Sequence, residues 1–417
     1  MASNLTFSFE TYLVGGAVRD QLLNLPIIDR DWVVVGANYA QMLEHGFKSV
    51  GKDFPVFLHP DTHEEYALAR QERKTGKGYH GFSVIADGTV SLEEDLSRRD
   101  LTINAIAKAC DGRLIDPYNG IDDLNARVLR HVSIAFKEDP VRVLRLARFY
   151  ARLYDFGFKI ATETKQLISE MIAQGELNYL SPERIWIELS KALNGAHPDQ
   201  FIACLRELGA LKIILPEVDA LFGIPQRPEY HPEIDSGLHT LMVMRQAALL
   251  NADADTLFAC LCHDLGKATT PTHILPKHTQ HESRGAVLAK KLAQRLKIPN
   301  DTQTLAIKVA KYHLYFHTLN QLRAVTILKL LLSLDALRRP LVLDQFILAC
   351  IADERGRLCF EDREILQGEF LKECLIALKG IDAKQLLLTV DPAKIPEIIH
   401  LERLKKIKNV IKDYTWS

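Results

Sequence analysis

Residues 12–36 read YLVGGAVRDQLLNLPIIDRDWVVVG, and this stretch decides the fold of the N-terminal part of the chain. An apolar run meets the pair Gly15–Gly16, a short helical pattern follows, and two aspartates open a second apolar run. The pattern predicts a strand, a helix and a second strand. Because side chains two residues apart on a strand leave the same face, we expect Asp29 and Asp31 to present their carboxylates to one point in space.

Paired carboxylates of this kind are hard oxygen ligands that suit Mg²⁺. Two such ions about 4 Å apart can clamp an in-line phosphoryl displacement. Gly16 lacks a Cβ, so a triphosphate could approach the backbone N–H groups where the helix begins. Each signal has a plainer interpretation, since a Gly-Gly pair before a helix is usually a turn and an Asp-x-Asp at a strand edge is usually solvated. The ordered combination is more specific than either part.

This combination, Gly-Gly-x-x-Arg-Asp followed by Asp-x-Asp, resembles the nucleotidyltransferase superfamily related to DNA polymerase beta. Within it, the chain is most similar to the class II branch of CCA-adding tRNA nucleotidyltransferases and bacterial poly(A) polymerases. The resemblance implies that Asp29 and Asp31 are catalytic Mg²⁺ ligands and that Gly16 and Arg19 hold the triphosphate. Glu65 is a further candidate for a metal carboxylate, although a glutamate on a half-exposed strand is usually solvated.

The bulk properties limit the class of protein. A chain of 417 residues predicts two to four domains. Its 52 basic and 53 acidic residues nearly cancel, so any RNA site must be a local patch. The seven cysteines show no metal-ribbon spacing and their number is odd, which favours a reducing compartment. We find neither a signal-peptide pattern nor an apolar run of about 18 residues, and therefore expect a cytoplasmic protein without a membrane span.

The periodicity of the chain changes near residue 136. Short apolar strands, at residues 31–36, 54–59 and 65–70, alternate with turns before this point, and long helical periods without a convincing strand follow it. Prolines near residue 228 mark a second boundary. We expect an α+β protein: a small mixed-sheet head resembling that of DNA polymerase beta, then an all-α neck and an all-α domain. The predicted domains are residues 1–136, 137–228, 229–360 and 361–417, the last being a helical tail.

A second motif, RRDLTINA at residues 98–105, follows in the head. Its two arginines could neutralise a triphosphate, while Asp100 and Asn104 could read a ribose from one face. An N-capped helix with solvated arginines would explain the same residues. The motif is similar to the ribose-reading motif of the family, which implies that Arg99 lies near the nucleotide. DPYNGIDDL at residues 116–124 resembles the flexible, turn-rich connection between head and neck.

The neck carries an arginine stripe. At about 100° per residue, Arg142, Arg145, Arg148 and Arg152 fall in one sector of the predicted helix, opposite most of its apolar residues. A solvated face would explain the stripe, and so would a row of forks for phosphates and base edges. The stretch resembles the family's Glu-Asp-x-x-Arg amino-acid template. The resemblance implies that Asp139 and Arg142 select the incoming base, with Arg145 and Arg148 near the nucleotide.

Histidines and aspartates mark the third domain. His239, the adjacent pair His263–Asp264 within FACLCHDLGK, and the distant Asp353 occur in an order that resembles the HD phosphohydrolase superfamily. In that superfamily such ligands converge on a divalent metal that activates water. His281 and His313 are weaker candidates. Imidazole and carboxylate together accept a transition metal such as Ni²⁺, Mn²⁺ or Zn²⁺ more readily than Mg²⁺ alone.

The resemblance covers about residues 12–360 and implies a multifunctional enzyme. Its head would add C, C and A to the 3′ end of tRNA from CTP and ATP without a nucleic-acid template. Its HD domain would act as a 2′,3′-cyclic phosphodiesterase, 2′-nucleotidase and phosphatase in tRNA maturation and repair. Three alternatives stay open: a poly(A) polymerase, an HD phosphohydrolase with a nucleotide-sensing head, and an enzyme that nucleotidylates a regulatory protein. A near-neutral net charge disfavours the poly(A) polymerase, and the intact Asp29 and Asp31 disfavour the sensing head.

Overall fold

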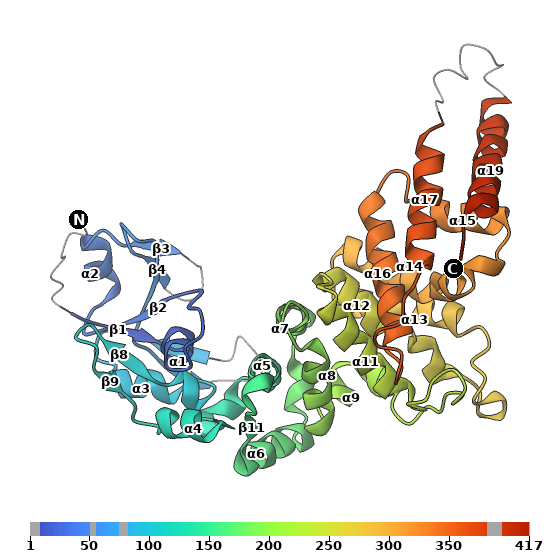
Figure 1. Cartoon of the computed structure of the whole chain (residues 1–417). Coiled ribbons are helices and arrows are strands. Elements are labelled where there is room, and N and C mark those ends of the chain that lie inside the picture. Colours follow the sequence, from blue (N-terminus) through green and yellow to red (C-terminus); the bar gives the residue numbers. More distant parts are fainter. Residues whose placement is uncertain (1–8, 51–55, 75–81, 382–393, 417) are drawn as a thin grey trace. The chain divides into compact units, whose positions relative to one another are not determined.

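The computed structural model describes residues 9–50, 56–74, 82–381 and 394–416. The chain divides into two compact units (Figure 1). Unit 1 comprises residues 1–181 with 208–210, and unit 2 comprises residues 182–207 with 211–417.

Unit 1 is built on a mixed sheet. Among the described residues, seven strands follow the order β3-β4-β5-β2-β1-β8-β9. Strand β2 lies antiparallel to β1 and parallel to β5. The strands are β1 (Glu10–Val14), β2 (Asp31–Val35), β3 (Lys48–Val50), β4 (Val56–Leu58), β5 (Glu65–Leu68), β8 (Ala107–Ala109) and β9 (Leu114–Ile115). The predicted strand at residues 54–59 starts outside the described residues, at Phe54. The mixed sheet confirms the predicted class of the head.

Both faces of the sheet are covered by apolar side chains. Val33 and Val34, adjacent on β2, point to opposite faces and are each almost wholly buried. Val34 belongs to a core cluster with Met42 of α2 (Tyr39–Glu44), and Val33 belongs to a cluster with Leu96 of α3 (Leu92–Ser97). Each such burial contributes about 1.5–3 kcal/mol, so β2 is a firmly held strand whose first residue lies at the edge of the core.

The rest of unit 1 consists of short elements followed by two longer helices. These are α1 (Gly16–Leu22), the strands β6 (Gln71–Lys74) and β7 (Phe82–Ile85), the 3-10 helix η1 (Thr102–Asn104), α4 (Gly120–Ala126), α5 (Val141–Arg152) and α6 (Thr162–Ala173). Two features differ from the predictions. The segment expected to be a turn-rich connection contains α4, because both carboxylate oxygens of Asp116 accept from the first backbone N–H groups of that helix. A strand, β11 (Lys159–Ile160), pairs with β10 (Val128–Leu129) beyond residue 136.

Unit 2 is helical throughout its described residues. Its helices are α7 (Pro182–Leu193), α8 (Pro198–Glu207), α9 (Leu211–Ile214), α10 (Pro216–Asp219), α11 (Ser236–Leu249), α12 (Ala254–Cys262), α13 (His281–Arg295), α14 (Asn300–His317), α15 (Ala324–Ser333), α16 (Pro340–Arg355), α17 (Gln367–Lys379) and α19 (Ile395–Asp413). None of the described helices is both long and apolar enough to cross a lipid bilayer.

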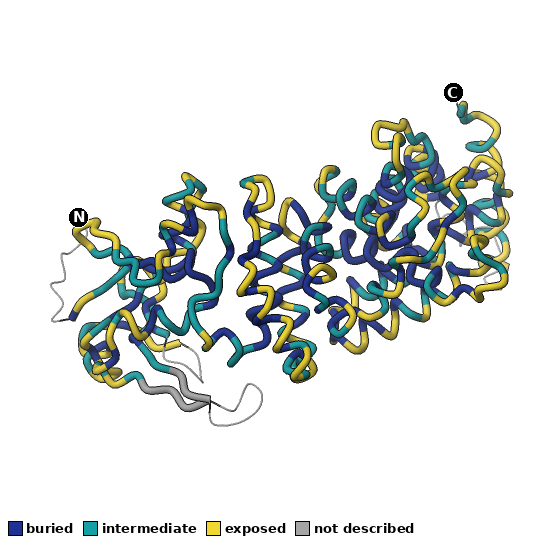
Figure 2. The backbone as a smooth tube through the Cα atoms, turned by 90° about the horizontal axis from the view of Figure 1, so that it is seen from below, coloured by how far each residue is buried: buried dark blue, intermediate teal, exposed yellow. Residues whose placement is uncertain are grey.

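Helix α12 lies at the centre of unit 2. Residues 256–262 are all buried, and the helix contacts α7, α11, α14 and α16 (Figure 1). Figure 2 shows buried backbone, in dark blue, through the interior of the helical part of the chain. The 3-10 helix η5 (Leu265–Thr269) then runs close to the start of α13. A Cβ on Gly266 would lie 1.9 Å from the carbonyl oxygen of His281, so only glycine allows this approach. The end of α12 is thereby held against the first turn of α13.

Candidate functional site

The carboxylates predicted for the head lie where β2 begins. Asp31 is the first residue of β2, and the parallel register pairs it with Glu65 of β5, which places both side chains on one face of the sheet. Asp29 precedes the strand and does not belong to it, contrary to the predicted strand start. Partial desolvation raises the pKa of Asp31, and the charge of Asp29 adds to the rise, while Arg99 and Arg145 oppose it. Three charged groups therefore interact with Asp31.

The glycine pair lies beneath Arg99. Gly15 has a φ of 69°, and a Cβ there would lie 2.9 Å from Nη1 of Arg99, so the turn requires glycine. Nη2 of Arg99 donates to Asp95 over 3.3 Å. Its Nε is buried and has no hydrogen-bond partner within the described part of the chain. Arg99 is thus fixed beside the turn with one donor unsatisfied, as suits an anion-binding group.

Arg19 lies in the interior of unit 1. Its side chain is 1% exposed, with Nε and Nη2 donating to Asp20 and Nη1 donating to Asn104 over 2.6 Å. The guanidinium also stacks 4.8 Å from the ring centroid of Phe149. All three nitrogens are engaged, so Arg19 supports the site from below in this conformation instead of presenting donors at its surface.

The arginine face of α5 packs onto the head and is not a purely solvated stripe. Arg145 donates to Asp100 over 2.7 Å, and Arg152 donates to Asp20 over the same distance. Both carboxylates are buried. Although burial alone would raise the pKa of Asp100, the charge of Arg145 and hydrogen bonds from Asn104 and Arg145 hold it well below its usual value. The ion pairs therefore fasten α5 beside the RRDLTINA motif.

The predicted base-selecting pair lies at the start of α5. Oδ1 of Asp139 accepts from the backbone N–H of Val141 over 3.1 Å, as a helix-start residue does. Arg142 is 8% exposed and donates to the carbonyl oxygen of Ala135 over 2.7 Å. Arg148, further along the helix, lies over the ring of Phe149 at 4.6 Å. The contacts described here all join residues of unit 1.

In unit 2 the four predicted metal ligands meet in the interior, although they come from three separate places in the chain. His239 lies on α11, His263 and Asp264 directly follow α12, and Asp353 lies on α16. Nε2 of His239 lies 3.0 Å from Oδ1 of Asp353, and Nε2 of His263 lies 3.1 Å from Oδ2 of Asp264. The donor atoms of His239, His263 and Asp353 all lie within 4.8 Å of one another.

A second trio joins Asp264 with His281 and His313, the two weaker candidates. Their donor atoms also lie within 4.8 Å of one another, and all three residues are buried. Oδ1 of Asp264 faces this trio, while its Oδ2 faces His263 of the first. The Nε2 atoms of His281 and His313 are 3.3 Å apart. Asp264 therefore lies between two groups of nitrogen and oxygen donors.

The histidines of both trios are held in the tautomer that metal binding needs. A carbonyl oxygen only accepts, so a histidine whose Nδ1 faces one carries its proton there and leaves the Nε2 lone pair available. Nδ1 faces the backbone carbonyl oxygen of another residue in each case: Gly356 for His239, Cys260 for His263, His278 for His281 and Val309 for His313. Burial lowers the pKa of His313 to about 3, so this imidazole is neutral at physiological pH.

The donor set fits a divalent cation. Nε2 of His263 and Oδ1 of Asp264 are buried without a hydrogen bond to any described residue. Buried polar atoms are normally satisfied, and a cation bound to nitrogen and carboxylate oxygen would satisfy both.

Two residues of this centre were missed in the sequence. Oε1 of Glu233 lies 3.0 Å from Nδ1 of His239 and 2.9 Å from Nδ1 of His231. His317 lies 2.7 Å from Asp353 and 2.6 Å from Glu354. Burial would lower the pKa of His317, but these two acidic partners raise it to about 9. His317 therefore lies against Asp353 as a basic partner of that carboxylate. The position of His317, one helical turn after His313, was the available signal.

Three family descriptions match parts of the chain. The Poly A polymerase head domain matches residues 11–130, a probable RNA and SrmB-binding site of polymerase A matches residues 157–222, and the HD domain matches residues 237–339. Among solved structures, a Thermotoga maritima CCA-adding enzyme complexed with tRNA-CCA and a CCA-adding enzyme with CTP each share the fold at a TM-score of 0.62 and 20% identity. Each match covers 97% of this chain and 90% of the other.

Sequence relatives cover nearly the full length. A multifunctional CCA protein of Thioalkalivibrio sulfidiphilus is 55% identical over 402 residues, which cover 96% of this chain and 98% of the relative. A multifunctional CCA protein of Acinetobacter baumannii is 52% identical over 403 residues, with the same coverage. The chain belongs to the family of multifunctional CCA proteins.

Proposed function

We propose that this protein adds C, C and A to the 3′ end of tRNA from CTP and ATP without a nucleic-acid template, and releases pyrophosphate. Its HD domain would act as a 2′,3′-cyclic phosphodiesterase, 2′-nucleotidase and phosphatase on tRNA ends. The near-full-length identity to multifunctional CCA proteins supports both activities. The CTP and the tRNA-CCA bound by the solved neighbours support nucleotide addition. The reaction takes place on tRNA, so we place the protein in the cytoplasm.

The ion pair between Arg145 and Asp100 carries the polymerase proposal. This ion pair joins α5 to the RRDLTINA motif. The charges of Arg99, from that motif, and Arg145, from α5, both lower the pKa of Asp31. A nucleotide bound there would have carboxylates at its phosphates and guanidinium groups beside its base. That arrangement suits selection of a base by protein side chains.

Each side chain has a proposed role. Asp29 and Asp31 hold Mg²⁺, with Glu65 as a third carboxylate, and Gly16 and Arg99 lie against the triphosphate. Asp139 and Arg142 pair with the base edge, while Arg145 and Arg148 lie near the nucleotide. Arg19 positions this group through Asn104 and Asp20. When bound, Mg²⁺ supplies charge neutralisation for the pyrophosphate and acidifies the primer hydroxyl.

For the hydrolytic centre we propose His239, His263, Asp264 and Asp353 as ligands, with His281 and His313 completing the set. Glu233 orients His239, and the protonated His317 holds Asp353. A transition metal such as Ni²⁺ or Mn²⁺ would supply an activated water. We retain the predicted domains, residues 1–136, 137–228, 229–360 and 361–417, as part of the proposal.

A nucleotide-addition assay tests the polymerase function. The full chain is incubated with tRNA lacking its last three nucleotides, first with CTP, then with ATP, then with both, and products are resolved at single-nucleotide length. We expect two additions with CTP, none with ATP alone, and three with both. Long adenylate tails from ATP alone would instead identify a poly(A) polymerase. The absence of any extension would contradict the proposal.

A further inference from the structure

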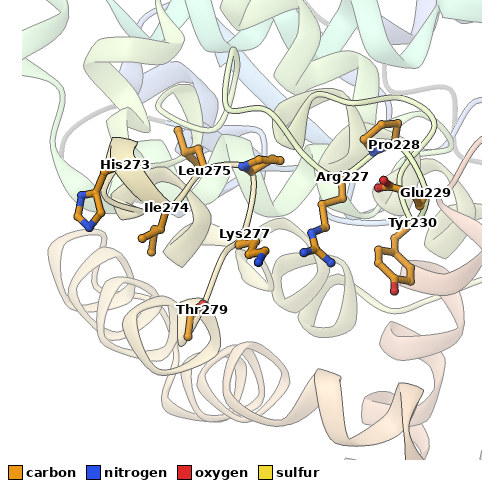
Figure 3. Close-up of a pocket in the computed structure, with 10 residues that line it drawn as sticks. Arg227, Pro228, Glu229, Tyr230, His273, Ile274, Leu275, Lys277 and Thr279 are labelled. Carbon is orange, nitrogen blue, oxygen red and sulfur yellow. The ribbon is translucent and has the colours of Figure 1, made fainter.

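A pocket in unit 2 lies next to the HD centre and has no role in the proposed chemistry so far. It has a volume of about 690 Å³, which lies within the range of small-molecule sites (Figure 3). Two loops line it: residues 227–230, and residues 273–277 with Thr279. The volume is sufficient for one nucleotide.

Each loop leads directly into a residue of the metal centre. Tyr230, which lines the pocket, precedes His231, the partner of Glu233. The other loop ends at Thr279, two residues before His281. Nε2 of His278 lies 3.0 Å from the carbonyl oxygen of Pro225, which ties the two loops together. A ligand in the pocket would therefore lie close to the metal-binding trios.

The pocket is lined by two cationic side chains, Arg227 and Lys277, and by one carboxylate, Glu229, which lies beyond ion-pair distance of both. In the figure, Lys277 and Arg227 lie between His273 and Tyr230 (Figure 3). Arg227 is half-buried, and neither cation has a carboxylate within ion-pair distance in the described ranges of the chain. The turn that presents Arg227 is firm, because its carbonyl oxygen accepts from the N–H groups of residues 230 and 231. A half-buried guanidinium without a partner is suited to bind an anion of the ligand.

We propose that this pocket binds the 5′-phosphate side of the nucleotide whose 2′,3′-phosphate is hydrolysed at the HD centre. Arg227 and Lys277 would hold that phosphate, which in an RNA chain is the last internucleotide phosphate. The inference rests on the proposed HD phosphohydrolase activity. It predicts that the HD centre prefers a terminal nucleotide that also carries a phosphate on its 5′ side, as in RNA, over a nucleoside that carries only the 2′,3′-cyclic phosphate.

Three substrates separate these cases: adenosine 2′,3′-cyclic phosphate, the same compound with a 5′-phosphate, and a short RNA ending in a 2′,3′-cyclic phosphate. The full chain, supplied with Mn²⁺, is assayed for KM and kcat on each. The wild type should show a KM about tenfold lower for the two substrates with a 5′-side phosphate, a factor that corresponds to one charge-assisted contact. R227A and K277A should each remove most of that preference.

R338A and K291A are the matched controls, since both residues are exposed in the same unit and neither lines the pocket. Both should keep the wild-type preference. A wild type without preference, or a preference unchanged in R227A and K277A, would overturn the inference while leaving the phosphohydrolase intact. A wild type that hydrolyses none of the three substrates would overturn the proposed HD activity itself. A preference for the RNA but not for the 5′-phosphorylated mononucleotide would also overturn the inference, because it would come from RNA groups other than this phosphate.

Discussion

Nε of Arg145 donates to Oδ2 of Asp100 over 2.7 Å, and these two residues are 45 positions apart in the sequence. The contact anchors the helix expected to choose the base onto the motif expected to read the ribose. Asp100 is buried, and its other oxygen accepts from Asn104 over 2.9 Å. A rigid joint of this kind keeps the two functions in register.

Asp100→Asn should destabilise unit 1 at neutral pH by about 2 kcal/mol, because it removes a buried charge-assisted contact. The pKa of Asp100 is held below its ordinary value, so its contribution is present above about pH 4 and is lost as the pH falls through the folded-state pKa. The difference between wild type and variant should therefore shrink in acid. Urea unfolding followed by Trp32 fluorescence, with Trp186 and Trp416 replaced by Phe, measures it. The exposed Asp122→Asn is the control, and a difference independent of pH would contradict the account.

Asp31→Asn should reduce nucleotide addition by about 1,000-fold, because the loss of one metal carboxylate removes several kcal/mol of transition-state stabilisation. Phosphohydrolysis at the HD centre should be unaffected. Radiolabelled CTP incorporation into tRNA measures the first activity, and release of phosphate from a 2′-phosphorylated nucleotide measures the second. Asp122→Asn again serves as the matched variant. Retention of more than a tenth of the wild-type addition rate would remove Asp31 from the mechanism.

His263→Ala should have the opposite effect. It deletes a buried side chain of the first trio that we propose as a metal ligand, so phosphohydrolysis should fall below detection while CCA addition continues. The variant should also bind less metal, measured by equilibrium dialysis and elemental analysis of the wild type and the variant. The exposed His400→Ala should retain the wild-type metal content. Unchanged metal binding in His263→Ala would place the cation elsewhere.

Glu233→Gln tests a residue that acts through a ligand. Its carboxylate faces Nδ1 of His239, and partners of this kind orient the imidazole, so metal affinity should fall about 10-fold to 100-fold. Competition titration with a chromogenic chelator measures that affinity. Added metal should restore the activity, whereas a residue with a purely structural role would not be rescued. Glu369→Gln, an exposed change on α17, provides the comparison.

The sequence predicted the parts that depend on local order. A continuous apolar run predicted β2. The strand is buried on both faces, which explains why its apolar residues are consecutive. The order of His239, His263, Asp264 and Asp353 resembles the HD superfamily, and this resemblance predicted that the four residues converge. Their burial became visible only in the structure. The α+β class followed from the change in periodicity near residue 136.

Features that depend on distant contacts were not predictable. The burial of Arg19 depends on distant contacts, since Asn104, which accepts a hydrogen bond from it, lies 85 positions away. Arg152 pairs with Asp20 across 132 positions, so the stripe on α5 could equally have faced water. Glu233 contacts His239 from the loop before α11, where no helical period links the two residues. His317 meets Asp353 across 36 positions, so only its spacing from His313 could be seen in the sequence. The short pair β10 and β11 has too few residues for periodicity to show.

The most direct test of the central claim is a crystal structure of the protein with Mn²⁺ and a non-hydrolysable CTP analogue, with the metal located by anomalous scattering. We predict metal peaks about 2.1 Å from carboxylate oxygens of Asp29 and Asp31, and the cytosine edge against Asp139 and Arg142. Peaks elsewhere in the head, or a base that does not contact the start of α5, would contradict the account.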